Sequence, residues 1–145
     1  MFKHILLPTD GSPLSEVAIA QGIAFAKSIG ARVTGFHVIS PFHLIAADVE
    51  MVTDTREQYE GYSRAQAVAA LAVIARTAKQ AGVACECVSE TDNHPHEAII
   101  RAAEKRGCDL IMMASHGRRG VQGLLIGSET NKVLTHTKIP VLVLR

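Results

Sequence analysis

Residues 110–130 read LIMMASHGRRGVQGLLIGSET, and this stretch decides the fold class of the 145-residue chain. Its first six residues are almost all apolar, which is typical of a strand with both faces covered. Three glycines follow, and a fourth stands in Gly127-Ser128, where the next helix is expected to begin. A buried strand, a glycine-rich loop and a helix in this order predict a parallel α/β sheet with a ligand site at the end of this strand.

The rest of the chain repeats the same alternation of strand and helix. Strands are expected at about residues 4–10, 31–39, 83–90, 110–115 and 141–144, and helices at about residues 13–29, 54–81, 95–106 and 129–137. The segment 41–53 shows no clear periodicity and is expected to be a loop with at most a helical turn. Parallel strands joined by right-handed helical crossovers carry helices on both sheet faces. The sequence therefore predicts one three-layer, Rossmann-like α/β domain spanning residues 1–145.

The composition argues against two classes of protein, nucleic-acid binders and membrane proteins. Hydrophobic residues make up 48% of the chain, charged residues 20%, and the formal net charge is +1. A near-neutral charge argues against a dedicated nucleic-acid binder, which needs a concentrated basic face. No apolar run approaches the roughly 20 residues that span a bilayer, and the first residues lack the features of a signal peptide. We therefore expect a cytoplasmic protein that binds neither nucleic acid nor membrane.

The three cysteines do not form a disulfide framework. Cys85 and Cys87 are two residues apart in an expected strand, and Cys108 stands alone. Two residues at this spacing point to the same face of a strand. We expect both thiols to pack against the core, in preference to a redox or metal-binding role.

Ligands of parallel sheets bind outside the carboxyl ends of strands, which directs attention to three segments. These are residues 8–12, residues 38–40 and the loop from Ser115 onward. In the loop, glycines leave backbone N–H groups uncovered, and a helix start at Gly127-Ser128 favours an anion. Arg118 adds positive charge. The residues alone leave two interpretations equally open, an anion site or a set of turns with Ser128 as a helix cap.

Asp10 follows the first expected strand in the sequence PTDGS. A carboxylate at this position can accept hydrogen bonds from a ribose or face a phosphate-bound Mg²⁺. Aspartate is also common in tight turns before glycine. The residue alone favours this turn role over the binding role, and both interpretations stay open.

The sequence resembles the universal stress protein family in its single-domain form. Three segments carry the resemblance: ILLPTDGSPLSEVAI (residues 5–19), FHVI (36–39) and MMASHGRRGVQGLLIGSETNKVLTHTKIPVLVL (112–144). The ATP-binding branch of that family carries Gly-x₂-Gly-x₉-Gly-Ser/Thr. The matching positions here are Ala114, Gly117, Gly127 and Ser128, so alanine replaces the first glycine.

The resemblance implies a five-stranded sheet in the order 3-2-1-4-5 and an adenine nucleotide, ATP with Mg²⁺, as ligand. It implies that Asp10 lies by the ribose or the metal, and that Val38 holds adenine through its backbone. It further implies a homodimer that pairs through the last strand, Val141–Leu144. The residues that would bind the cofactor are Pro8, Thr9, Asp10, Val38, Ala114, His116, Gly117, Arg118, Gly127, Ser128 and Glu129.

Two other functions stay open beside nucleotide-dependent regulation of a stress response. A slow ATPase would need a general base, for which the sequence offers Asp10 and His116. A nucleotide-free dimeric interaction module is kept open by Ala114. A metal site at His94 and His96 is the less favoured interpretation of NHPHEA, because no further ligand cluster has zinc-like spacing.

Overall fold

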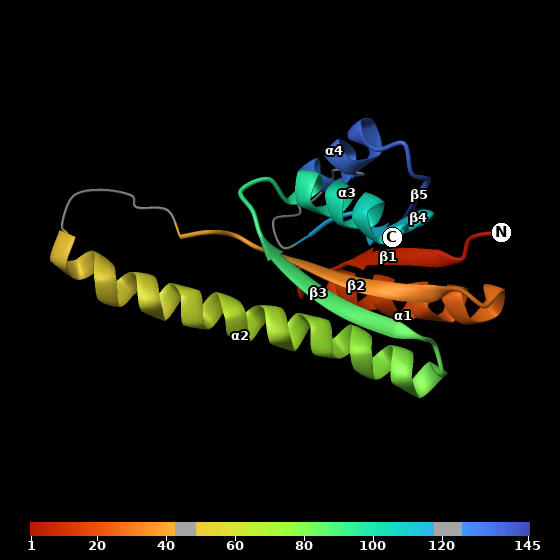
Figure 1. The fold of residues 1–145 in the computed structure, drawn as a ribbon, viewed down its shortest axis with the longest axis horizontal. Helices are drawn as coiled ribbons and strands as arrows, with labels where there is room; N and C mark the ends of the chain where they lie inside the picture. Colours follow the sequence, from red (N-terminus) through yellow and green to blue (C-terminus); the bar gives the residue numbers. More distant parts are fainter. Residues whose placement is uncertain (43–48, 118–125) are drawn as a thin grey trace.

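The protein alternates strands and helices along its whole described length (Figure 1). The computed structural model describes residues 1–42, 49–117 and 126–145, with residues 49–54 described by their backbone alone. The strands are β1 (His4–Pro8), β2 (Arg32–Ile39), β3 (Cys85–Thr91), β4 (Leu110–Ala114) and β5 (Val141–Leu144), and the helices are α1 (Pro13–Ile29), α2 (Val49–Ala81), α3 (Pro95–Arg106) and α4 (Ser128–His136). The alternation predicted from sequence is confirmed.

The five strands form one parallel sheet in the order β3-β2-β1-β4-β5. The chain first builds outward from β1 through β2 to β3, and then returns to place β4 on the other side of β1. The strand order thus reverses beside β1, where His4 pairs with Arg32 of β2, and Ile5 pairs with Leu110 of β4. Helices leave the sheet on opposite faces at such a point and open a crevice at the strand ends.

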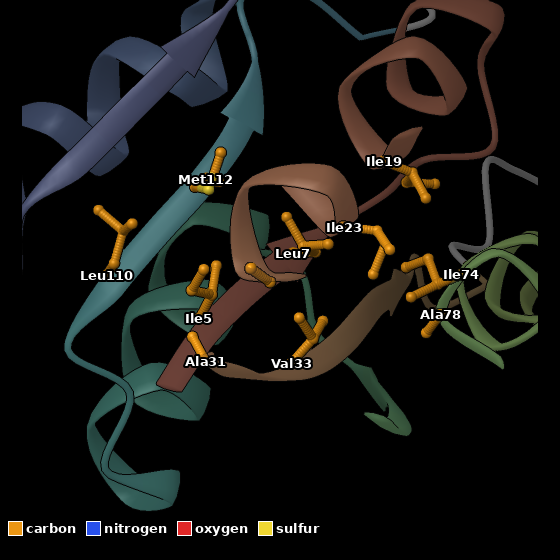
Figure 2. Close-up of a cluster of buried hydrophobic side chains, with 11 residues drawn as sticks. Ile5, Leu7, Ile19, Ile23, Ala31, Val33, Ile74, Ala78, Leu110 and Met112 are labelled. Atoms are coloured by element: carbon orange, nitrogen blue, oxygen red, sulfur yellow. The ribbon is translucent and has the colours of Figure 1, made fainter. Parts of the chain in front are cut away.

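Two hydrophobic layers hold the helices to the sheet. Alternate residues of each strand point to opposite faces, so Ile5 and Leu7 face α1 and α2, whereas Leu6 faces α3 and α4. Figure 2 shows the first layer, in which Ile19 and Ile23 of α1 meet the strand residues. The second layer is built on Phe36 and Ile111, which are fully buried. Each such side chain contributes about 1.5–3 kcal/mol by leaving water.

Helix α1 shows how local sequence sets the element bounds. Ser12 is the N-cap, and its hydroxyl accepts a hydrogen bond from the backbone N–H of Ser15. Pro13 follows at the first helical position, where the missing N–H costs nothing. The helix ends at Gly30, whose φ of 67° lies in the left-handed region that glycine adopts without strain. These residues account for the helix bounds of about 13–29 that the sequence predicts.

The prediction for α2 was wrong at its start. The sequence suggested a loop up to about residue 53, but the helix begins at Val49. Residues 49–53 contain β-branched side chains, which weaken a helical pattern, but no proline or glycine that would end a helix. In Figure 1 the first half of α2 extends well beyond the sheet. Within the described chain, no helix is long and apolar enough to cross a membrane.

Candidate functional site

A cavity of about 730 Å³ lies at the carboxyl ends of β1, β2 and β4. Its volume falls within the range of about 300–1,000 Å³ that is typical of small-molecule sites. Ten of the predicted site residues line it: Pro8, Thr9, Asp10, Val38, Ala114, His116, Gly117, Gly127, Ser128 and Glu129. The eleventh, Arg118, lies outside the described residues. Segments far apart in the sequence are thus brought together around one space, as the carboxyl-end rule predicted.

Asp10 sits in a tight turn between β1 and α1. Its Oδ1 accepts hydrogen bonds from the backbone N–H of Ser12 at 2.9 Å and from the hydroxyl of Ser15 at 2.7 Å. Gly11 supplies the positive φ of 77° that the turn requires. The turn role that the sequence suggested for Asp10 is therefore confirmed. It also fixes the carboxylate at the cavity wall, so a structural role and a binding role do not exclude each other.

Gly117 stands directly against Asp10 across the cavity. A β-carbon built on Gly117 would overlap the Oδ2 atom of Asp10. The glycine is thus required by close approach, because any side chain at this position must displace the carboxylate. The loop after β4 and the turn after β1 are held against each other by this contact.

The first turn of α4 faces the same cavity. Gly127 is its N-cap, and no side chain of the described residues caps the helix. Two hydrogen bonds anchor this turn to β4 and the residue after it: the Gly127 N–H donates to the Ser115 carbonyl at 2.7 Å, and the Thr130 hydroxyl donates to the Ala114 carbonyl at 3.0 Å. Uncapped N–H groups at a helix start carry a partial positive charge. The arrangement is suited to an anion.

His116 lies beside this helix start. Its ring packs within 3.7 Å of the position that a β-carbon on Gly127 would take. Nδ1 is 3.0 Å from the Ser115 hydroxyl, whereas Nε2 is buried and has no hydrogen-bond partner among the described residues. A buried, unpaired ring nitrogen is costly unless a ligand satisfies it. In the tautomer that protonates Nε2, His116 adds a second donor next to the start of α4.

Ala114 replaces the first glycine of the motif without disturbing the backbone. It is the last residue of β4, is buried and pairs with Leu144 of β5. Extended strand backbone is open to any residue with a side chain. At this position the structure therefore does not need the conformational freedom of glycine.

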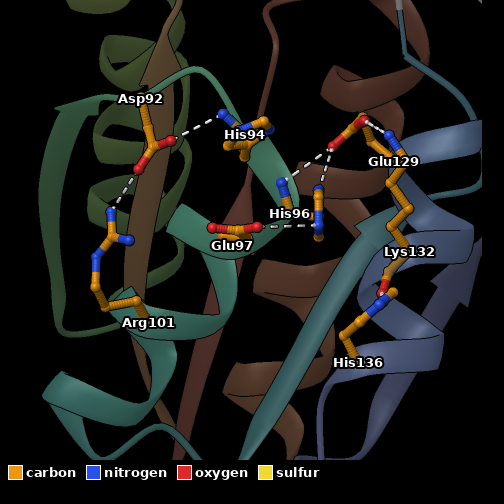
Figure 3. A network of polar contacts seen from close by, with 8 residues as sticks. All are labelled: Asp92, His94, His96, Glu97, Arg101, Glu129, Lys132 and His136. Atoms are coloured by element: carbon orange, nitrogen blue, oxygen red, sulfur yellow. Dashed lines mark hydrogen bonds and ion pairs between the residues drawn. The ribbon is translucent and has the colours of Figure 1, made fainter.

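Glu129 lines the cavity, but its carboxylate is directed to neighbours on α3 and α4 (Figure 3). Oε2 accepts from the His96 backbone N–H at 3.0 Å and from its ring Nδ1 at 3.2 Å, and Oε1 accepts from Lys132 at 2.9 Å. Burial by itself would raise the pKa of Glu129, but the hydrogen bonds from Lys132 and His96 hold it below its ordinary value. The negative charge is thereby balanced beside the helix start. His96 serves this contact between α3 and α4.

Beside the predicted Val38, β2 and α2 contribute residues to the cavity wall that were not predicted from the sequence. His37 lines the cavity and donates its Nδ1–H to the Thr9 carbonyl at 2.8 Å. From α2 come Tyr59, Ser63 and Gln66. The only signal for His37 was its place one residue before Val38 at the end of a strand. The helix residues gave none, because their position depends on how α2 packs over the sheet.

Comparison with known proteins identifies the family of the chain. The sequence model of the Universal stress protein family matches residues 1–145. The chain belongs to the universal stress protein family. Universal stress protein MJ0577 of Methanocaldococcus jannaschii is 28% identical to it over 156 residues, which cover 100% of this chain and 96% of that protein. The solved structure of MJ0577 matches with a TM-score of 0.81, covering 99% of this chain and 96% of that chain.

Two further universal stress protein structures share the fold at lower identity. One is a universal stress protein in complex with cAMP, with a TM-score of 0.72, 21% identity and coverage of 99% of this chain and 97% of that chain. The other is a family protein from Arabidopsis thaliana with AMP bound, with a TM-score of 0.69, 17% identity and coverage of 98% and 90%. At these identities the likeness establishes the family fold.

Proposed function

We propose that this universal stress protein binds an adenine nucleotide, ATP with Mg²⁺, in the cavity and acts as a nucleotide-dependent regulator in the stress response. One observation carries the proposal. The uncapped first turn of α4 faces the cavity beside the buried, unpaired Nε2 of His116. A polyphosphate satisfies both, because it offers several acceptor oxygens and negative charge to the helix N–H groups, and to His116 Nε2 in the tautomer that carries its proton there.

In this proposal the phosphates lie at Gly127-Ser128. The backbone N–H groups of the first turn and the Ser128 hydroxyl donate to them. Gly127 has no side chain to cover these donors, and its φ of −68° and ψ of 158° leave the turn unstrained. Arg118 is expected to add charge to this end of the site.

The nucleoside end lies toward β2. The Asp10 carboxylate accepts from the ribose hydroxyls, and the Val38 backbone reads the edge of the adenine. Phe36, Ile99 and Met113 supply apolar surface to the cavity, which suits a flat base. The cAMP and AMP found in two family structures each contain the adenine, ribose and phosphate that the cavity is proposed to bind.

Mg²⁺ enters this proposal with the nucleotide. It takes oxygen ligands and is commonly held by one or two carboxylates together with substrate phosphates. In the described parts of the chain, no group of three His, Cys, Asp or Glu side chains is placed to hold a metal ion. Asp10 is the carboxylate that we propose as a ligand of Mg²⁺, so the phosphates and water must supply the other ligands of the ion.

The proposal also includes a homodimer in the cytoplasm. Strand β5 is at the edge of the sheet, with β4 on its inner side. Leu142 of this strand is 40% exposed. An unpaired apolar edge invites another strand, and a second copy of β5 across a two-fold axis would cover it.

Release of bound nucleotide tests the proposed function. The protein is purified without added nucleotide, denatured and filtered, and the filtrate is analysed by ion-exchange chromatography with mass detection. We expect adenine nucleotide from the wild type and none from Gly127→Val, whose side chain would crowd the Ser115 carbonyl and His116 and displace the start of α4. A wild type that releases nothing, and whose melting temperature does not change in millimolar ATP with Mg²⁺, would instead support the nucleotide-free interaction module.

A further inference from the structure

Cys85 and Cys87 form a pair of thiols on the edge strand β3, away from the nucleotide cavity. The strand places both side chains on the face that α1 and α2 cover, where each packs at the border of the first hydrophobic layer. Both are partly accessible to solvent, whereas Cys108 is buried. Cys85 and Cys87 therefore differ from a core cysteine in two respects. Each has a second thiol on the same strand face, and each is partly accessible to solvent.

The two thiols are neighbours on one face of β3, because residues two apart on a strand point to the same side. Cys87 Sγ donates to the Leu71 carbonyl of α2 at 3.6 Å, and Cys85 Sγ donates to the Glu86 carbonyl at 3.5 Å. Gly35 of β2 lies opposite Cys87, and a β-carbon there would be 3.1 Å from the sulfur. The missing side chain at Gly35 thus makes room for the pair beneath α2.

Strand geometry opposes a disulfide between these two residues. Residues two apart on a strand have Cα atoms about 6.6 Å apart, near the upper end of about 6.8 Å that disulfides accept. Their Cα–Cβ bonds run parallel, whereas a disulfide needs the Cβ atoms to approach to about 3.8 Å. Closing the bond would require β3 to bend away from β2. Reduced thiols are therefore the form that this strand supports.

A bridging metal ion needs no such movement. Metal–thiolate bonds are about 2.3 Å long, so two sulfurs on opposite sides of one ion stand about 4.6 Å apart. Two parallel side chains on one strand face can bring their sulfurs to such a distance by rotation about χ1, without movement of the strand. Within the described residues, no third His, Cys, Asp or Glu side chain is placed to complete a larger coordination shell. A four-coordinate ion such as Zn²⁺ is thereby disfavoured, and a soft ion that can be two-coordinate with two thiolate ligands is favoured.

We propose that Cys85 and Cys87 bind one soft monovalent metal ion of the Cu(I) class per chain, as a two-coordinate dithiolate site at the edge of the sheet. Each thiol loses its proton on binding, so two protons are released for one ion and the metal keeps its oxidation state. The site is independent of the proposed nucleotide function. Failure of either proposal leaves the other standing.

The test is an anaerobic titration of the reduced full-length protein with Cu(I) in competition with a chromophoric Cu(I) chelator. We expect one ion per chain, and Cu(I) affinity about 100-fold weaker or worse in Cys85→Ser and in Cys87→Ser. Cys108→Ser is the matched control and should bind like the wild type. Equal binding in all four proteins, or loss of binding in Cys108→Ser alone, would overturn the proposal.

Alkylation of the native wild type provides a readout that does not depend on any variant folding. Peptide mass spectrometry after brief iodoacetamide treatment should show Cys85 and Cys87 labelled in the metal-free protein and both protected by one equivalent of Cu(I). Protection of one cysteine without the other would contradict a shared ion. A Cys85–Cys87 disulfide in protein purified without reductant would contradict the geometric argument against that bond.

Discussion

Asp10 and Gly117 meet so closely across the cavity that a β-carbon on the glycine would overlap the carboxylate. The two residues come from opposite halves of the chain, one after β1 and one after β4. Their contact joins the turn that positions the proposed ribose ligand to the loop that leads to the proposed phosphate site. The most sensitive substitutions in the cavity should therefore be those that add volume at this point.

Gly117→Ala should weaken nucleotide binding and destabilise the fold. The added methyl must displace Asp10, which would strain or break its hydrogen bonds to Ser12 and Ser15. Overpacking of this kind costs about 1–3 kcal/mol, and we expect nucleotide affinity to fall about tenfold or more. Calorimetric titration and urea unfolding measure the two effects.

Gly61→Ala is the matched control for this substitution. Gly61 lies on the exposed surface of α2, with nothing within 4 Å of the position that a β-carbon would take. Alanine should stabilise the helix by about 0.5–1 kcal/mol and leave nucleotide affinity unchanged. Equal affinities in the two alanine variants would show that the contact between Asp10 and Gly117 does not bear on binding.

Ala114→Gly restores the motif glycine and should gain little. Ala114 is buried in β4 in extended conformation, so glycine adds backbone freedom to the unfolded chain without relieving strain. We expect a loss of about 0.5–1 kcal/mol in stability and nucleotide affinity within about threefold of the wild type. An affinity gain of tenfold or more would mean that the alanine methyl obstructs the ligand.

Val143→Pro should break the proposed dimer and spare the sheet. The carbonyls of Pro140 and Leu144 accept hydrogen bonds from β4, so the polar backbone groups of Val143 point to the outer edge. Proline removes the N–H at that position. Sedimentation velocity should show a dimer for the wild type and for Val143→Ala, and a monomer for Val143→Pro. A dimer in the proline variant would locate the interface elsewhere.

His4 should make stability depend on pH in a window below its ordinary pKa of 6.5. Thr34 Oγ1 donates to Glu86 at 3.0 Å, so it must accept the hydrogen bond from His4 Nε2 at 2.7 Å. Nδ1 is then the unprotonated nitrogen, and in the described structure it is buried without a partner. Burial, followed by the charge on Arg32, lowers the pKa of His4.

The sign of this effect follows from proton counts. Between the lowered pKa and 6.5 the unfolded chain binds a proton at His4 that the folded chain does not, so stability rises with pH and is lost on acidification. The carboxylates Glu86 and Asp109 have lowered pKa values and act only below about 4.5, their ordinary range. Urea unfolding at about pH 7.5 and about pH 5.5 should show this loss in the wild type and a smaller one in His4→Gln. Equal losses would assign the effect to another group.

The sequence predicted most of the sheet because its strands are short apolar runs bounded by clear turn signals. The carboxyl-end rule located the cavity, and the resemblance supplied the strand order and the motif residues. The sequence could not reveal that Tyr59 and Gln66 line the cavity, because a helical pattern does not show which turn of a helix packs over the end of a strand. Nor could it show that Glu129 pairs with His96, since that contact depends on the packing of α3 beside α4. The start of α2 was missed because β-branched residues weaken the helical pattern there. The helix nevertheless continues, because the segment contains no proline or glycine.

Titration of nucleotide-free protein with ATP and Mg²⁺ tests the central claim most directly. The comparison is between the wild type and Gly127→Val. The φ of −68° and ψ of 158° at this position are open to residues with a side chain, but a β-carbon there would stand 3.2 Å from the Ser115 carbonyl oxygen and 3.3 Å from His116 Cα, so the start of α4 must shift. We expect a saturable heat of binding with one site per chain for the wild type and no heat of binding for the variant. Circular dichroism should show that both proteins are folded. No heat in the wild type at millimolar nucleotide, or equal binding by the variant, would contradict the claim that the start of α4 holds the phosphates.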